Sequence, residues 1–128
     1  MKYVCCAALL FGLFGAGAVA QDFSSKTGAD LLAQCQLVGR PDLNILEMMS
    51  SLQCVSYLRG MANTLVIWKA FSDARNKANP PQACAPDGVI PRELAMVVVK
   101  FLNDHPTKLH DEYGIVAFSA LVDAYPCK

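Results

Sequence analysis

Six cysteines set the strongest limits on how this chain folds. Cys5 and Cys6 lie in an apolar run at the N-terminus, and the other four are spread over the rest of the sequence: Cys35, Cys54, Cys84 and Cys127. None of these four has the C-x-x-C spacing of a redox motif or a zinc ribbon. An even number of cysteines in a small exported domain predicts two disulfides, and four cysteines can pair in three ways.

The first twenty residues predict a cleaved secretory signal. Lys2 precedes an apolar run that extends to Ala20 and ends in the small-x-small sequence Ala18-Val19-Ala20. A membrane anchor needs about 20 apolar residues with a stop signal behind them, whereas this run is rich in glycine and is followed by Gln21. Cleavage after Ala20 is therefore expected. It removes residues 1–20, including the early cysteine pair, which lies too near the start to form a lipobox, and leaves residues 21–128 as one domain.

The composition excludes two broad classes of protein. Of the 128 residues, 54% are hydrophobic and 17% are charged, so the chain is not an intrinsically disordered one. Eleven basic residues balance eleven acidic ones and are scattered, so no basic stripe for nucleic acid is present. No membrane association is expected once the signal has been removed.

Proline and glycine divide residues 21–128 into helices and connectors, without strand-like alternation over more than a few residues. The chain is predicted to be all-α, a small disulfide-stapled bundle of about four helices. The first helix is expected to be capped by Ser24 or Ser25 and to end at Gly39-Arg40-Pro41. The second is expected from Ser51 to about Arg75, opened by a Ser50-x-x-Gln53 capping box.

One face of the second predicted helix carries a stripe that should be core: Cys54, Val55, Leu58, Met61, Leu65 and Trp68. Gly60 lies inside this run. A glycine in mid-helix costs about 1 kcal/mol relative to alanine, so the sequence favours close backbone contact between Gly60 and a neighbouring helix over the alternative, a tolerated weak spot in the helix. Trp68 and Phe71 flank Lys69 and could together anchor a partner, but the core stripe favours a buried Trp68.

Two further helices are expected after a proline-rich connector over residues 76–90. Pro91 occupies a first-turn position with Glu93 close behind it, where the helix dipole favours an anion. The amphipathic stripe of this third helix is Leu94, Val97, Val98, Phe101 and Leu102. Pro106 is expected to open a last helix, which ends before Pro126 and whose inward residues are Leu109, Tyr113, Val116, Leu121 and Val122.

The order of the helices predicts how the cysteines pair. Helices joined by a short turn run antiparallel, so the start of one lies beside the end of the next. Cys84 precedes the third helix and Cys127 follows the fourth, so these two should meet. Cys35 and Cys54 should meet by the same argument. In the chain-entropy model the two disulfides stabilise the fold by about 3 kcal/mol for Cys35–Cys54 and about 4 kcal/mol for Cys84–Cys127.

The sequence offers little for catalysis. His105 and His110 are five residues apart, so they do not share a helix face as the histidines of H-E-x-x-H do. Asp111 and Glu112 are adjacent and diverge around a helix, which favours solvation. No phosphate-binding glycine loop and no G-x-S-x-G elbow occurs, and the cysteines are assigned to disulfides. We therefore predict a protein without catalytic, cofactor-binding or metal-binding residues, which is not an enzyme.

Four short elements in order carry a resemblance to a known family. They are Cys54-Val-Ser-Tyr57-Leu-Arg-Gly60, Cys84-Ala-Pro86-Asp-Gly88, the segment from Val98 to His105-Pro106, and the terminal segment from Leu121 to Cys127. In this order they resemble the Rap/Tai family, the type VI secretion amidase immunity proteins, and Ser56 stands where the family more often has glycine. The resemblance covers nearly the whole of residues 21–128.

The resemblance implies a small periplasmic helical protein without catalysis of its own, often a homodimer. Such a protein binds a peptidoglycan amidase effector and blocks its catalytic cleft with a protruding loop. Asn79, Pro80, Pro81 and Gln82 form the candidate toxin-binding loop, because a proline-stiffened segment tethered by Cys84 limits the ordering cost of binding. The connector from Arg40 to Glu47 is the second candidate. The alternative function is that of a general periplasmic binding or chaperone-like helical protein without a cognate toxin.

Overall fold

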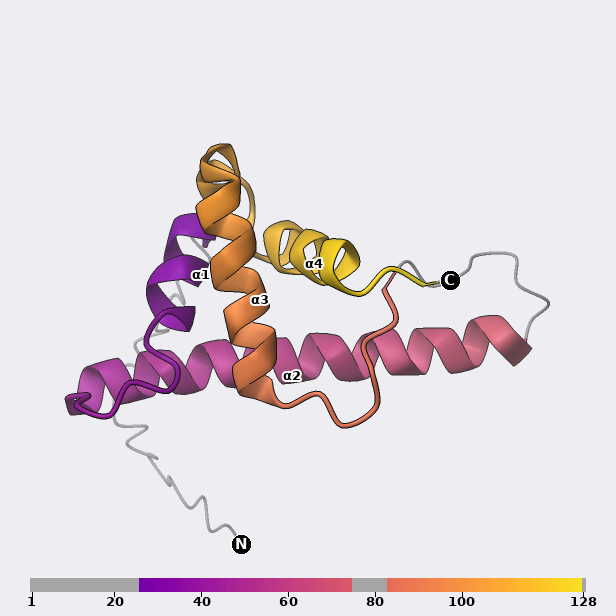
Figure 1. Cartoon of the computed structure of the whole chain (residues 1–128), viewed down its shortest axis with the longest axis horizontal. Coiled ribbons are helices and arrows are strands. Elements are labelled where there is room, and N and C mark those ends of the chain that lie inside the picture. The colour runs from indigo at the N-terminus through magenta and orange to yellow at the C-terminus, as the bar shows by residue number, and fades with distance from the viewer. Residues whose placement is uncertain (1–25, 75–82, 128) are drawn as a thin grey trace, which may run out of the picture.

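The computed structural model describes residues 26–74 and 83–127. In these residues the chain forms four α-helices, α1 (Gly28–Cys35), α2 (Ile45–Ala74), α3 (Pro91–Asp104) and α4 (Tyr113–Ala124), and a 3-10 helix, η1 (Pro106–His110). The predicted all-α architecture with two disulfides is confirmed. Figure 1 shows α2 as a long base, with α1, α3 and α4 on one side of it.

The first helix starts later than predicted. Its cap is Thr27 rather than Ser24 or Ser25, and the backbone N–H of Thr27 donates a hydrogen bond of 2.8 Å to Asp30 Oδ2. This bond lowers the pKa of Asp30 below its ordinary value. The helix ends at Cys35, and Gly39 adopts a φ of 86° in the turn that follows, a backbone conformation that glycine adopts most readily.

The second helix starts six residues earlier than predicted, so the proposed Ser50-x-x-Gln53 cap is wrong. The working capping box is Asn44-x-x-Glu47. Asn44 Oδ1 accepts hydrogen bonds from the backbone N–H groups of Leu46 and Glu47, and Glu47 Oε2 accepts one from the Asn44 N–H. These contacts satisfy backbone donors that the first turn of a helix leaves free. At 30 residues, α2 is about 45 Å long.

The third helix begins at Pro91 as predicted, and Glu93 Oε2 accepts a hydrogen bond from the Ile90 N–H. The last helix differs from the prediction, because the chain from Pro106 forms η1 and then breaks before α4. At the break the backbone pairs with the segment before α1. The Gly28 N–H donates to the Asp111 carbonyl at 2.9 Å, and the Tyr113 N–H donates to the Lys26 carbonyl at 2.8 Å. A continuous helix could not make these bonds.

The core lies between α2 and the three helices on its one side. Its largest fully buried side chains come from all four helices: Leu31, Leu58, Leu94, Leu102, Leu121, Val98, Val116 and Cys54. Within α2 the buried positions are Ser51, Cys54, Leu58 and Leu65. The C-terminal end of α2 extends past α1, α3 and α4 in Figure 1. No helix in the part of the chain that the structure describes is long and apolar enough to cross a bilayer.

Candidate functional site

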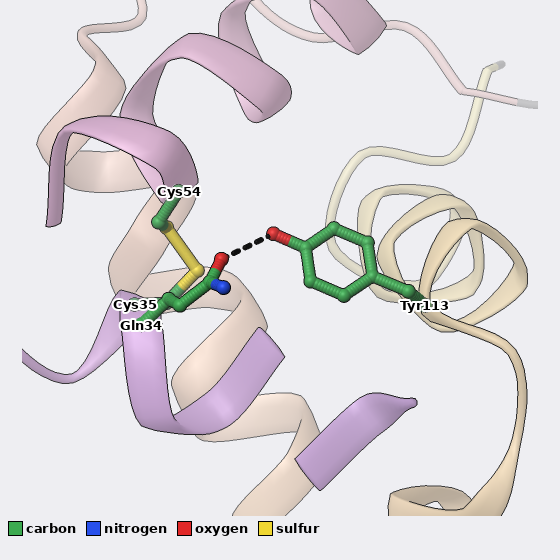
Figure 2. Close-up of a disulfide and its surroundings, with 4 residues drawn as sticks. All are labelled: Gln34, Cys35, Cys54 and Tyr113. Carbon is green, nitrogen blue, oxygen red and sulfur yellow. Dashed lines mark hydrogen bonds between the residues drawn. A yellow bond between two sulfur atoms is a disulfide. The ribbon is translucent and has the colours of Figure 1, made fainter. Parts of the chain in front are cut away.

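Two disulfides cross-link segments of the chain that lie far apart in the sequence. Cys35 is bonded to Cys54 with a Cα–Cα distance of 5.2 Å, and Cys84 is bonded to Cys127 with a Cα–Cα distance of 4.9 Å. These are the pairs that antiparallel neighbours predict. The first disulfide is buried and joins α1 to α2 (Figure 2). The second is partly exposed and joins the segment before α3 to the C-terminal segment after α4.

A tyrosine beside the buried disulfide joins α4 to α1 and α2. The Tyr113 hydroxyl donates a hydrogen bond of 2.8 Å to Gln34 Oε1, next to Cys35 (Figure 2). Its ring meets that of Tyr57 edge to face, with 4.7 Å between the ring centroids. Burial raises the pKa of Tyr113 to about 12. The Tyr113–Gln34 hydrogen bond and the Tyr57–Tyr113 ring contact therefore connect α4 to α1 and α2.

The candidate loop Asn79, Pro80, Pro81 and Gln82 lies outside the described residues, so its role stays a prediction. The structure describes the point to which that loop is attached. Ala83 is buried and forms an isolated bridge with Pro126, and the Cys84 N–H donates a hydrogen bond of 2.7 Å to the Tyr125 carbonyl. Together with the Cys84–Cys127 disulfide, these contacts make a rigid anchor at one end of the loop.

The second candidate, Arg40 to Glu47, divides into two parts. Ile45 to Glu47 form the first turn of α2, while Arg40, Pro41 and Asp42 are exposed in the connector from α1. The Asn44 cap lies at one end of this connector and the turn at Gly39 lies at the other. The Arg92 side chain packs close to that turn, because a Cβ added to Gly39 would lie 2.9 Å from Arg92 Nε. It is thus a short, exposed connector between two ordered ends.

Of the two histidines, one contacts its own helix and the other is exposed to solvent. His105 Nδ1 is 2.8 Å from the Phe101 carbonyl, which places this ring at the end of α3, and its ring lies over that of Phe101. His110 is exposed at the end of η1. Among the described residues no group of three or more His, Cys, Asp or Glu side chains could hold a metal ion.

The exposed apolar surface of α2 is the main feature that the sequence analysis missed. Trp68 was expected in the core, but 52% of it is exposed, as is 62% of Phe71. Of the residues in the expected core stripe, Cys54, Leu58 and Leu65 are buried, whereas Trp68 lies at the edge of a groove that Phe118 of α4 also lines. Further large apolar side chains of this helix are exposed as well: Ile45, Leu46, Met48, Met49, Leu52, Val66 and Ile67. The sequence did carry a signal for this exposed surface, because apolar residues occur on all faces of α2.

Gly60 does not make the close contact predicted for it. A Cβ added at this position would meet nothing within 4 Å, so none of the described helices packs closely against it. Gly60 instead lines an apolar groove of about 590 Å³ between α2 and α4, bounded by Tyr57, Met61 and Phe118 among others. A second, more polar hollow of about 390 Å³ lies between α2 and the segment before α3, where Arg59 and Asp87 line it.

Comparison with models of protein families shows to which family the chain belongs. The model of the Rap1a immunity proteins matches residues 27–127, which include all four helices and both disulfides. The chain belongs to the Rap1a immunity protein family. The searches of curated proteins and of solved structures gave no match.

Membership of the Rap1a immunity family indicates which kind of functional site to expect on this disulfide-linked fold. An immunity protein acts by binding a partner effector protein, so its functional site is a protein-binding surface. In this Rap1a-family protein the described surfaces suited to that role are the anchored 40–42 connector and the exposed apolar faces of α2.

Proposed function

We propose that this protein is a periplasmic immunity protein that binds a type VI secretion peptidoglycan amidase effector and occludes its catalytic cleft. The observation that carries the proposal is the family match over residues 27–127. The protein acts stoichiometrically, by binding and without turnover, and it acts as a homodimer. Its two disulfides suit an oxidising compartment such as the periplasm.

The proposed inhibitory element is the loop Asn79-Pro80-Pro81-Gln82, inserted into the amidase cleft. A loop that is ordered before binding loses little affinity to conformational entropy. The buried Ala83 and the Cys84–Cys127 disulfide support this, because they anchor the point from which the loop departs. Prolines at two of the four positions limit the backbone further.

A protection assay tests the function and locates the loop. Cells that export the amidase encoded next to this protein should lyse, and co-expression of the protein should prevent lysis. Replacing Asn79-Pro80-Pro81-Gln82 with a Gly-Ser linker should abolish protection. The matched control replaces the exposed Arg40-Pro41-Asp42 in the same way and should protect fully.

If the 40–42 variant loses protection and the 79–82 variant keeps it, the inhibitory site is the 40–42 connector. Lysis in the presence of the wild-type protein would contradict the immunity function itself. Broad suppression of aggregation of unfolded proteins by the purified chain would then favour the chaperone-like alternative.

A further inference from the structure

The apolar groove between α2 and α4 is a surface that neither the disulfides nor the two candidate loops account for. It measures about 590 Å³, which is within the range of pockets that bury small molecules. Tyr57, Met61 and Trp68 line it from α2, and Phe118 lines it from α4. None of the described residues that line the groove is charged, so the groove suits an occupant without charge.

The composition of the groove favours an aromatic occupant. Among the described residues that line it, Tyr57 is 37% exposed and Trp68 is 52% exposed, so both rings are open to contact. Aromatic rings attract a further ring edge to face or offset, and the sulfur of Met61 is favourable at the edge of such a ring. An aromatic side chain therefore fits this lining well.

The chain before α1 leads toward the groove. Thr27 pairs with Glu112 in an antiparallel bridge, and the Tyr113 N–H donates a hydrogen bond of 2.8 Å to the Lys26 carbonyl. In an antiparallel pair, a step backward along one segment accompanies a step forward along the other. The residues before Lys26 therefore leave this pairing in the direction in which Tyr113 begins α4.

The start of α4 lies at one end of the groove. The ring of Tyr113 meets that of Tyr57 with 4.7 Å between the ring centroids, and a Cβ added to Gly114 would lie 3.0 Å from the Tyr57 hydroxyl oxygen. Tyr57 is itself part of the groove lining. Only this pair of tyrosine rings thus separates the groove from the point at which the described chain begins.

The length of chain before Lys26 suits the groove. With cleavage after Ala20, five residues precede Lys26, and Phe23 carries the one apolar side chain among them. An extended chain advances about 3.3 Å per residue, so Phe23 can lie up to about 10 Å from Lys26 and the new N-terminus up to about 17 Å. The eleven helical residues from Tyr57 to Trp68 span about 16 Å.

We propose that residues 21–25 of the exported protein lie along the groove between α2 and α4, with the ring of Phe23 in contact with Met61 and Phe118. This contact removes apolar surface of the ring and of the groove from water. It also closes an apolar surface of the kind that binds apolar segments of other proteins. The inference goes beyond the proposed function and leaves the inhibitory surface where it is placed above.

Nuclear magnetic resonance of protein labelled at its methionine methyl groups tests the contact. Removal of residues 1–20 leaves four of the five methionines. Met61 is the one that lines the groove, whereas the other three, Met48, Met49 and Met96, are exposed elsewhere. We expect a nuclear Overhauser effect between the Met61 methyl group and the ring protons of Phe23.

Two substitutions within the segment make a matched pair. Phe23→Ala should abolish the Overhauser effect and shift the Met61 methyl signal, while the other three methionine signals stay in place. Ser25→Ala, a change of similar position outside the described fold, should leave the Met61 signal where it is in wild type. The helical circular dichroism of both variants should equal that of wild type, because neither residue belongs to a helix of the described chain.

Three results would overturn the docking of this segment. The first is a Met61 signal that is the same in wild type and in Phe23→Ala. The second is a signal that moves on dilution but not with Phe23→Ala, which would assign the groove to a second copy of the chain. The third is a signal that moves only when the amidase is added, which would assign the groove to the effector. None of these readouts measures inhibition, so failure of the docking and failure of the proposed function are distinguishable.

Discussion

At the scale of single residues, Tyr113 connects three helices through one side chain. Its hydroxyl bonds to Gln34 in α1, its ring packs against Tyr57 in α2, and its backbone begins α4. Tyr113→Phe keeps the ring and removes only the hydrogen bond. We expect a loss of about 1 kcal/mol in the free energy of unfolding, because Gln34 Oε1 loses its donor in a half-buried site. Urea denaturation of the two proteins measures this loss, and an unchanged midpoint would contradict it.

The same residue predicts how stability changes at alkaline pH. Burial raises the pKa of Tyr113 from 10.0 to about 12 in the fold. The stability linked to its neutral form is therefore complete below pH 10 and is lost as the pH rises from about 10 to about 12. An absorbance titration of phenolate should show a late step near pH 12 that is missing in Tyr113→Phe. A wild-type titration that is complete near the ordinary tyrosine pKa would contradict the burial argument.

Two helix glycines should respond in opposite directions to alanine. At Gly28 an added Cβ would overlap the Lys108 carbonyl oxygen and lie 3.2 Å from Leu109 Cα, both backbone atoms. Gly28→Ala should destabilise the fold by about 1–3 kcal/mol through overpacking. Gly60→Ala meets open space and should stabilise the monomer by up to about 1 kcal/mol through helix propensity. Thermal melts at low protein concentration compare them, and equal shifts would contradict the packing of α1 on η1.

At the scale of elements, the two disulfides differ in their access to solvent. Cys35 and Cys54 are 2% and 0% exposed, whereas Cys84 and Cys127 are partly exposed. Thiol–disulfide exchange needs access to a sulfur atom, so mild reduction of the folded protein should open Cys84–Cys127 first. Alkylation followed by peptide mapping identifies the pair. Early labelling of Cys35 and Cys54 would contradict the predicted order of reduction.

The helices show what the sequence could predict and what it could not. The start of α3 was predictable, because Pro91 and Glu93 are local signals for a helix start and the neighbouring segments offer no alternative start. The start of α2 was not, because Ser50-x-x-Gln53 and Asn44-x-x-Glu47 both have the form of a cap, and only Asn44-x-x-Glu47 makes the bonds. The exposure of Trp68 depends on where the neighbouring helices end. The spacing of apolar residues within α2 gives no information about that. The predicted loop at Asn79–Gln82 lies outside the described residues.

At the scale of the whole molecule, export should shorten the chain. Ala18-Val19-Ala20 predicts cleavage before Gln21, so the exported protein should lack Cys5 and Cys6 and carry two disulfides. Intact-mass measurement of protein recovered from the periplasm checks this. A mass that retains residues 1–20, or one that includes a lipid, would contradict the predicted signal.

The central claim is that this Rap1a-family protein neutralises an amidase by binding it. The most direct test is a titration of the purified amidase encoded beside it, with peptidoglycan as substrate. We expect inhibition that is complete at one chain of the protein per amidase and that does not depend on incubation time, because the proposed mechanism is binding without turnover. Full amidase activity in the presence of a several-fold excess of the oxidised protein would contradict the account.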